Sequence, residues 1–248
     1  MNTKYGQIIC YPRYEQKELE TRVNEMRKLG VKAVCFYGNK AIADVPVLGK
    51  GYSGIVVLAL LEDGYKVALK IYRTDSDPSR ITHEAKMLQI ANSINVGPQL
   101  LGYSNKLLMM KYIEGMLFPD WIEKLSGEKE RVFSRLSNVL KDILEQCWRL
   151  DSAGLDHGEL SWADKHIIVD VEESAHILDF ETASDKRKVA NVTSVSQYLF
   201  VKSRVAETIA QKFGRIDVEG LIQALRAYKV ERSRRNFESI LGVLGLLC

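Results

Sequence analysis

The chain has 248 residues, of which 46% are hydrophobic and 27% are charged, and its formal net charge is +3. This balance is typical of a folded globular protein and excludes a wholly disordered chain. No apolar run approaches the ~20 residues that a membrane-spanning helix needs, and the N-terminus lacks the apolar core of a signal peptide. We therefore expect a cytoplasmic protein with no membrane partner.

The first 45 residues predict a helix followed by a hairpin. Residues 14–29 carry apolar side chains at helical spacing, and Gly30 follows as a stop. Two short apolar stretches, 31–37 and 41–45, flank a Gly-Asn turn and predict two strands that pair with each other. We expect residues 1–45 to form an N-terminal extension or small domain.

Residues 47–72 predict an antiparallel meander that contains a glycine motif. Gly49, Gly51, Gly54 and Val56 match the pattern G-x-G-x-x-G-x-V. Dinucleotide folds place such glycines between a strand and a helix, whereas here they lie between two strands. A loop of this kind lets backbone amides approach phosphates, and an ordinary hairpin turn is the alternative interpretation.

Two later features are candidates for nucleotide contacts. Lys70 ends an apolar strand and needs an anion, which is either a phosphate or Glu84 of the helix predicted over residues 79–92. A surface lysine and an exposed helix charge are the alternatives. LLMMKYIEG resembles a kinase hinge, which implies that Met110 precedes a segment in which the Lys111 carbonyl and the Ile113 amide face the base; a plain strand end is the alternative.

The order of the predicted elements indicates a two-lobed α+β molecule. Strands are predicted up to residue 115, including two around a Ser-Asn turn at 104–105, and helices dominate after it. We therefore expect an antiparallel β lobe over residues 46–115 and a mostly helical lobe over residues 116–248. Short strands at 166–171 and 175–178 interrupt the helical part.

Two motifs beside these short strands carry acidic residues. They are LDHGELS at 155–161 and ILDFETAS at 177–184. Phosphoryl transfer needs one carboxylate to orient the attacking hydroxyl and accept its proton, and another to hold Mg²⁺. Glu159 and Asp179 fit these two roles, and the strand pair between them brings the motifs together.

Taken together, residues 49–184 resemble the protein-kinase-like superfamily. HGELS and LDFE are most similar to its small atypical members, which include the RIO kinases, the small kinase of the KEOPS complex, and the aminoglycoside and choline kinases. The resemblance implies that Lys70 and Glu84 bind the phosphates of ATP, that Asp179 chelates Mg²⁺ and that His157 supports the loop. Glu159 stands where the superfamily has its catalytic Asp.

The second metal ligand is left open by the same resemblance. The superfamily has an Asn there, whereas this chain has Asp164 and, two residues later, His166. The ligand is Asp164, His166 or neither. We prefer Asp164 because Mg²⁺ favours oxygen.

A closer resemblance is to archaeal proteins that share HGELS, LDFE and a downstream NVTS, found here at 191–194. One member of that group phosphorylates a ribose 2′-hydroxyl within tRNA, which implies an ATP-dependent RNA kinase with tRNA as partner. Residues 185–248 contain 12 basic and six acidic residues, as a polyanionic partner requires. The candidate RNA contacts are Lys186, Arg187, Lys188, Arg232, Arg234 and Arg235, and a solvated helix surface is the alternative for the arginines near the C-terminus.

Alternative functions follow from the same motifs. A serine/threonine protein kinase is the second choice, and a non-catalytic RNA-binding pseudokinase, suggested by Glu159 and the missing Asn, is the third. A small-molecule kinase ranks last, because no acidic or aromatic cluster marks an amine pocket in the second half of the chain.

Overall fold

The computed structural model describes residues 3–214 and 216–247, which form two compact units. The first unit comprises Met1–Gln89 with Pro98–Ile113, and the second comprises Ile90–Gly97 with Glu114–Cys248. Each combines helices with antiparallel strands, so the mixed α+β class is confirmed. The boundary predicted near residue 115 lies close to the break after Ile113, and residues 3–45 belong to the first unit.

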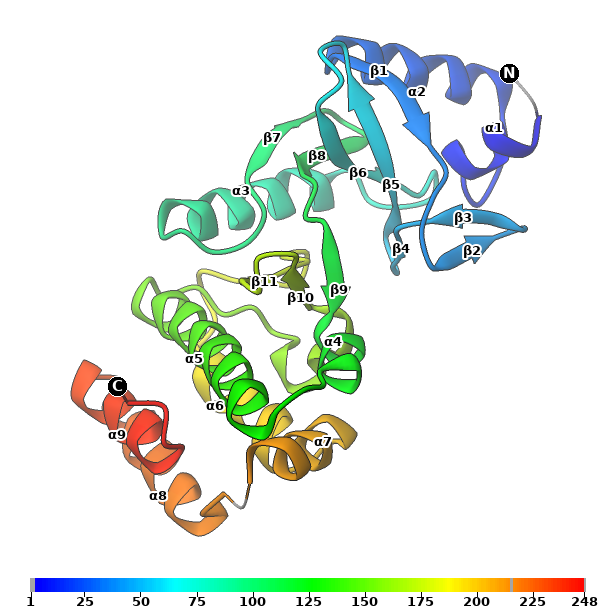
Figure 1. The fold of residues 1–248 in the computed structure, drawn as a ribbon. Coiled ribbons are helices and arrows are strands. Elements are labelled where there is room, and N and C mark those ends of the chain that lie inside the picture. The colour runs from blue at the N-terminus through cyan, green and yellow to red at the C-terminus, as the bar shows by residue number, and fades with distance from the viewer. Residues whose placement is uncertain (1–2, 215, 248) are drawn as a thin grey trace. The chain divides into compact units, whose positions relative to one another are not determined.

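The first unit is built on an antiparallel sheet with the strand order β1-β5-β6-β8-β7, and β4 pairs with β5 beside this path (Figure 1). The strands are β1 Val31–Cys35, β4 Gly49–Lys50, β5 Gly54–Leu61, β6 Lys66–Tyr72, β7 Leu100–Tyr103 and β8 Leu107–Lys111. Ile55, Val57 and Ala59 alternate into the core along β5, which is the period of a half-buried strand. The predicted meander, the strand pair β7–β8 and the helix over 79–92, observed as α3 Ser79–Ser93, are confirmed.

The hairpin predicted over residues 31–45 is wrong. Strand β1 pairs with β5, while β2 Lys40–Ile42 pairs with β3 Val45–Val47. The turn between β2 and β3 is made by Ala43 and Asp44, both with positive φ, as the tight turn of a two-residue hairpin requires. The local pattern favoured pairing of residues 31–37 with residues 41–45 across the Gly38-Asn39 turn. The backbone of β1 forms its hydrogen bonds with β5 instead.

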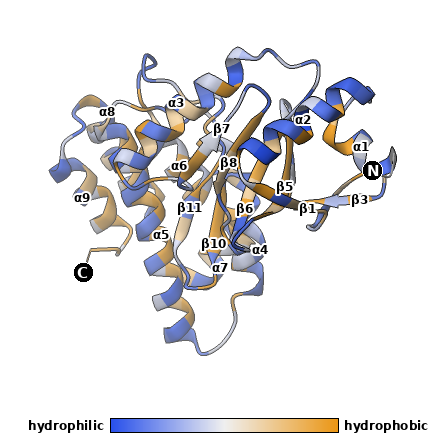
Figure 2. Cartoon of the chain, turned by 90° about the horizontal axis from the view of Figure 1, so that it is seen from above, coloured by the Kyte–Doolittle hydropathy of each residue, from blue (hydrophilic) through white to orange (hydrophobic). Residues whose placement is uncertain are grey.

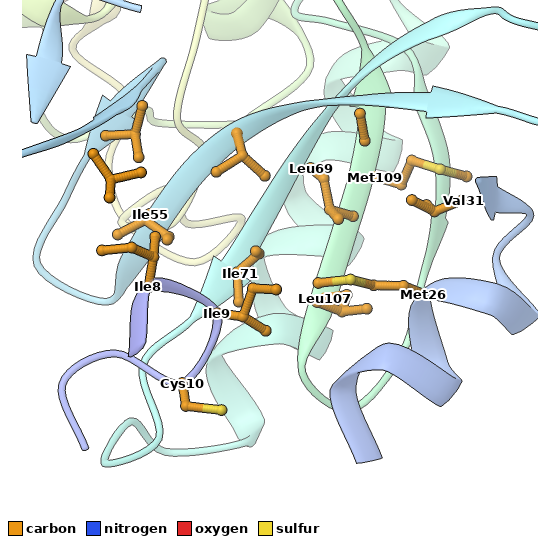
Figure 3. Packing of buried hydrophobic residues seen from close by; sticks show 14 of the residues in the cluster. Ile8, Ile9, Cys10, Met26, Val31, Ile55, Leu69, Ile71, Leu107 and Met109 are labelled. Atoms are coloured by element: carbon orange, nitrogen blue, oxygen red, sulfur yellow. The ribbon is translucent and has the colours of Figure 1, made fainter. Parts of the chain in front are cut away.

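The N-terminal helices share the core of this sheet. Helix α1 Thr3–Ile9 and helix α2 Gln16–Lys28, the latter predicted over 14–29, supply buried apolar residues to it. Figure 3 shows Ile8 and Ile9 of α1 close to Ile55 and Ile71 of the sheet, and Met26 of α2 beside Leu107. Residues 3–45 are therefore built into the first unit by apolar burial.

A buried arginine ties these helices to the sheet. Arg22 of α2 donates from Nη1 to the carbonyl oxygens of Ile9, at 2.8 Å, and Tyr72, at 2.5 Å. Its Nε lies 2.6 Å from Glu18, which also accepts from Lys106 at 2.8 Å. One guanidinium thus satisfies the end of α1, the end of β6 and a carboxylate of α2.

Replacing Arg22 with methionine tests this arrangement. The change keeps the apolar stem but leaves two carbonyls without this donor and Glu18 with Lys106 as its remaining cationic partner, so we expect the free energy of unfolding to fall by about 2–4 kcal/mol. Chemical denaturation followed by circular dichroism measures the change. Arg27→Met on the exposed side of the same helix is the matched control and should change stability by less than about 0.5 kcal/mol. Equal losses in the two variants would contradict the role of Arg22.

The second unit packs helices around α5 and a small three-stranded sheet with the order β11-β10-β9. Helix α5 contacts α6, α7 and β11, and α8 packs against α9 (Figure 1). The elements are β9 Gly115–Leu117, α4 Phe118–Lys124, α5 Lys129–Ser152, the 3-10 segment η1 Leu160–Lys165, β10 Ile167–Asp170, β11 Ala175–Ile177, α6 Asn191–Phe200, α7 Arg204–Phe213, α8 Val218–Val230 and α9 Arg234–Val243. The predicted strand pair between the two acidic motifs is confirmed, and β9 adds a third strand that periodicity did not indicate.

Hydropathy follows this architecture. Figure 2 shows apolar residues along β5, β6 and β8, and alternating polar and apolar bands around α5. The apolar band of α5 is buried from Val132 to Leu150. Among the described residues, no helix is both long and apolar enough to span a membrane.

Candidate functional site

The glycine loop of the first unit is a tight connection between β4 and β5. The amide of Gly51 donates to the carbonyl of Gly54 at 2.9 Å, and Gly49 lies opposite Val56. A Cβ on Gly54 would lie 2.5 Å from the carbonyl oxygen of Ile71, so strand pairing requires a glycine there. Among the described residues, the nearest atoms to such a Cβ would be 3.6 Å away at Gly49 and 3.7 Å away at Gly51, which is ordinary contact. The fold explains Gly54 and does not require glycine at the other two positions.

A buried ion pair joins strand β6 of the same sheet to helix α3. Lys70 Nζ is 2.7 and 2.9 Å from the two carboxylate oxygens of Glu84, and Lys70 and Glu84 are only 5% and 2% exposed. The Tyr72 hydroxyl also donates to Glu84, and the sequence did not indicate this second donor. The alternatives of a surface lysine and an exposed glutamate are therefore excluded. Val56 is directly opposite Lys70 in the β5–β6 register, which places the two side chains on one face.

The predicted base-contacting segment follows β8. Met110 and Lys111 are the last residues of this strand, opposite Ala68 and Val67 of β6, and Ile113 lies two residues beyond it. Met110 is half-buried and Lys111 is exposed. The nucleotide-contacting role of these three residues stays a prediction.

The second unit brings the two acidic motifs together. Asp156 and Ser184 exchange backbone hydrogen bonds of 3.0 and 2.8 Å, and Leu178 donates to the carbonyl of His166 at 2.8 Å. Glu159, His166 and Asp179 each offer one ligand atom within 4.8 Å of the others. His166 Nε2 lies 3.3 Å from a carboxylate oxygen of Glu159.

The backbone around this cluster is held in uncommon conformations. Asp179 has φ +67°, which few residues other than glycine and aspartate adopt and which often occurs at functional sites. Gly158 has φ +91°, and a Cβ there would lie 2.4 Å from a guanidinium nitrogen of Arg187. These two positions turn the chain so that Glu159 and Asp179 approach each other.

The ligand atoms of Glu159, His166 and Asp179 set which metal ion this cluster could hold. Carboxylate oxygens of Glu159 and Asp179 suit Mg²⁺ and Mn²⁺, and the imidazole of His166 extends the range to softer divalent ions such as Fe²⁺ and Zn²⁺. Asp164, the preferred second ligand from sequence, lies outside the three-residue group among the described residues and accepts the Tyr198 hydroxyl at 3.0 Å. Burial, with Asp164 beside it, raises the pKa of Tyr198. By position, His166 and not Asp164 lies with the two carboxylates, and the role of either residue as a metal ligand stays a prediction.

His157 supports the loop as the sequence indicated. Its Nε2 donates to the carbonyl of Leu178 at 2.9 Å, and its ring packs edge-on against His166 and Phe180. Burial lowers the pKa of His157 to about 4, although the bond to Leu178 acts in the opposite direction. His157 is therefore neutral at neutral pH and links one acidic motif to the other.

A polar network beneath the loop was missed by the sequence reasoning. Asn191 accepts the amide of His157 at 2.8 Å and donates to Asp151 and to the Leu155 carbonyl. Asp151 also accepts the amide of Asn191 and the Tyr228 hydroxyl, at 2.9 and 3.0 Å. The NVTS segment was noted, but only its position at the start of α6 reveals that its Asn holds the loop.

The basic residues expected to bind RNA divide into two groups. Arg187 binds Asp156 at 2.5 Å and the Thr182 carbonyl, and Arg234 binds both carboxylate oxygens of Glu145. These two arginines stabilise the unit itself. The others, Lys186, Lys188, Arg232 and Arg235, are exposed or partly exposed.

Comparison with known proteins gives little further guidance. No family model matches the chain. It is 29% identical over 102 residues, or 41% of its length, to the uncharacterized protein MJ1211 of Methanocaldococcus jannaschii, and the match covers 81% of that protein. This similarity carries no activity to the chain.

The contrast between Gly51 and Gly54 can be tested by alanine substitution. Gly54→Ala should destabilise the first unit by about 2 kcal/mol or more, because the methyl group overlaps the Ile71 carbonyl. Gly51→Ala should leave the free energy of unfolding within about 0.5 kcal/mol and, if the loop approaches phosphates as the sequence predicts, should weaken ATP binding. Denaturation curves and titration with a fluorescent ATP analogue measure the two effects. Equal destabilisation by both changes would show that the loop needs both glycines for folding.

The buried His157 predicts a loss of stability in mild acid. Its pKa is lower in the folded chain than in the unfolded chain, so the unfolded state takes up the proton first as the pH falls below about 6.5. Between pH 7.5 and 5 this costs about 2 kcal/mol. Denaturation with chelator present should show that His157→Gln loses about 2 kcal/mol less than wild type over this range. His176→Gln, at a partly exposed histidine of the same unit, should not reduce the loss.

Proposed function

We propose that the chain is an ATP-dependent RNA kinase that transfers the γ-phosphate of ATP to a ribose 2′-hydroxyl in tRNA. In this proposal the two units are the lobes of a protein-kinase-like fold. The observation that carries it is the buried ion pair of Lys70 and Glu84. A buried charge pair adds little net stability, because desolvation offsets the attraction, so its presence in an apolar unit points to a function.

The first unit supports binding of ATP. Lys70 is held by Glu84 where its ammonium can also reach the α- and β-phosphates. Gly49 and Gly51 leave room for a ligand to approach the backbone, and Val56 presents an apolar surface beside Lys70. Met110, Lys111 and Ile113 are the proposed contacts of the adenine base.

The second unit supports phosphoryl transfer. Glu159 accepts the proton of the attacking 2′-hydroxyl as its oxygen bonds to the γ-phosphorus, and the bond to the β-phosphate oxygen breaks to release ADP. Asp179, with His166 beside it, would hold the divalent cation. When bound, this ion neutralises charge on the transferring phosphate. His166 at 3.3 Å orients the Glu159 carboxylate, which offsets the extra methylene relative to aspartate.

The choice of RNA as acceptor has separate support. HGELS, LDFE and NVTS together resemble the pattern of the archaeal RNA kinase group, and this resemblance would explain Glu159 as a trait of that group. The surplus of basic residues after Asp185 suits a polyanion. An acidic or neutral surface on this part of the chain would have favoured a peptide or an amine as the phosphate acceptor.

Incubation with γ-labelled ATP, tRNA and Mg²⁺ or Mn²⁺ tests the proposal. Wild type should place label on the RNA, and mass spectrometry of the digested tRNA should find a phosphorylated ribose. Glu159→Gln should lower the rate by about 10²–10⁴-fold, since it removes the general base. Asp179→Asn should lower it at least as far, while Asp164→Asn, the same chemical change in the same unit, should lower it less than about 10-fold.

Other outcomes would replace the proposal. Label on protein but not on tRNA would favour a serine/threonine protein kinase. Tight tRNA binding without transfer, unchanged by Asp179→Asn, would indicate a pseudokinase. A loss with Asp164→Asn as large as that with Asp179→Asn would restore Asp164 as the metal ligand.

A further inference from the structure

A cavity of about 230 Å³ lies in the second unit, at the start of α6. Its walls include Lys188 from the segment before α6, Lys229 from the last turn of α8, and Arg232 just after α8. Its floor includes Asp151 and Tyr228. The volume is several times the ~30 Å³ that one water occupies, so the cavity admits a phosphate group with its ester oxygens.

The three basic side chains carry charge that the fold does not neutralise. Among the described residues, Lys188, Lys229 and Arg232 form no salt bridge. Arg187 and Arg234, close to them in sequence, are paired with Asp156 and Glu145. Three like charges around one cavity repel each other unless an anion lies between them.

The cavity is also pre-organised for an anion. One guanidinium nitrogen of Arg232 donates to the carbonyl of Val189 at 3.0 Å, which holds the planar group in place while the rest of it lines the cavity. The carboxylate of Asp151 on the floor accepts bonds from Asn191, Val192 and Tyr228. Because these donors already bind the Asp151 carboxylate, its negative charge offsets the charges of Lys188, Lys229 and Arg232 only in part.

We propose that this cavity binds one phosphate group of the RNA backbone. The identity of the ligand as RNA rests on the proposed function, whereas the site itself rests on the cavity and its unneutralised cations. The floor residues Tyr228 and Asp151 belong to the network that runs through Asn191 to the amide of His157. A phosphate held here would set the register of the RNA against the loop that carries Glu159.

Equilibrium binding of fluorescently labelled tRNA without ATP tests this site. Lys188→Ala/Lys229→Ala should weaken binding about 10-fold or more and reduce the slope of log Kd against log salt by about 1, as the loss of one phosphate contact requires. Lys129→Ala/Lys202→Ala removes the same charge from exposed lysines of the same unit. Lys129 starts α5, about 33 Å along that helix from Asp151, and Lys202 follows the far end of α6. This control should weaken binding less than about 2-fold.

A second arm separates RNA from free phosphate. Thermal unfolding of wild type and of both variants is measured with inorganic phosphate replacing chloride at constant ionic strength, which also confirms that the variants fold. Equal losses of tRNA affinity in the two double variants would overturn the proposal. This holds even if inorganic phosphate raises the unfolding temperature of the wild type and of neither variant. Binding of tRNA that depends on Lys188 and Lys229 but leads to no labelled RNA would leave this site standing and overturn the proposed function instead.

Discussion

The second unit depends on one buried carboxylate, Asp151. It accepts two amides at the start of α6, the side chain of Asn191 and the hydroxyl of Tyr228, so it joins the end of α5 to α6 and α8. Burial raises the pKa of Asp151, but these donors act against that effect. Asn191 then extends the network to the amide of His157. The loop with Glu159 is thus held from beneath by buried polar groups that satisfy one another's hydrogen bonds.

The first unit also contains buried polar groups that need hydrogen-bond partners, and two of these groups are cations. Arg22 and Lys70 are both buried: Arg22 donates to carbonyls of Ile9 and Tyr72, and Lys70 donates to the carboxylate of Glu84. Arg22 satisfies the ends of backbone elements, which is a structural task. Lys70 instead pairs with a side chain, the carboxylate of Glu84, and lies opposite Val56 of the strand that follows the glycine loop. This position beside the glycine loop is what makes Lys70, and not Arg22, the candidate for contact with a ligand.

Local patterns predicted most elements and failed where partners had to be chosen. The alternation along β5 and the helical spacing before Gly30 depend on near neighbours, so sequence alone reveals them. The hairpin over 31–45 failed because β1 had two possible edges, and only the fold decided for β5. Asp164 was preferred over His166 on ligand chemistry, but η1 carries Asp164 towards Tyr198, while His166 lies beside Glu159.

The sequence by itself determined the residue types of the site: a glycine loop, a strand lysine, two acids beside short strands and a basic C-terminal segment. Only the tertiary structure decided which of the basic residues are committed to the fold. Arg187 and Arg234 meet carboxylates 31 and 89 residues away, and Lys188 meets a cavity instead. The reason is that a charge is neutralised by its neighbours in space, within a few ångströms, and the linear order of residues does not specify them.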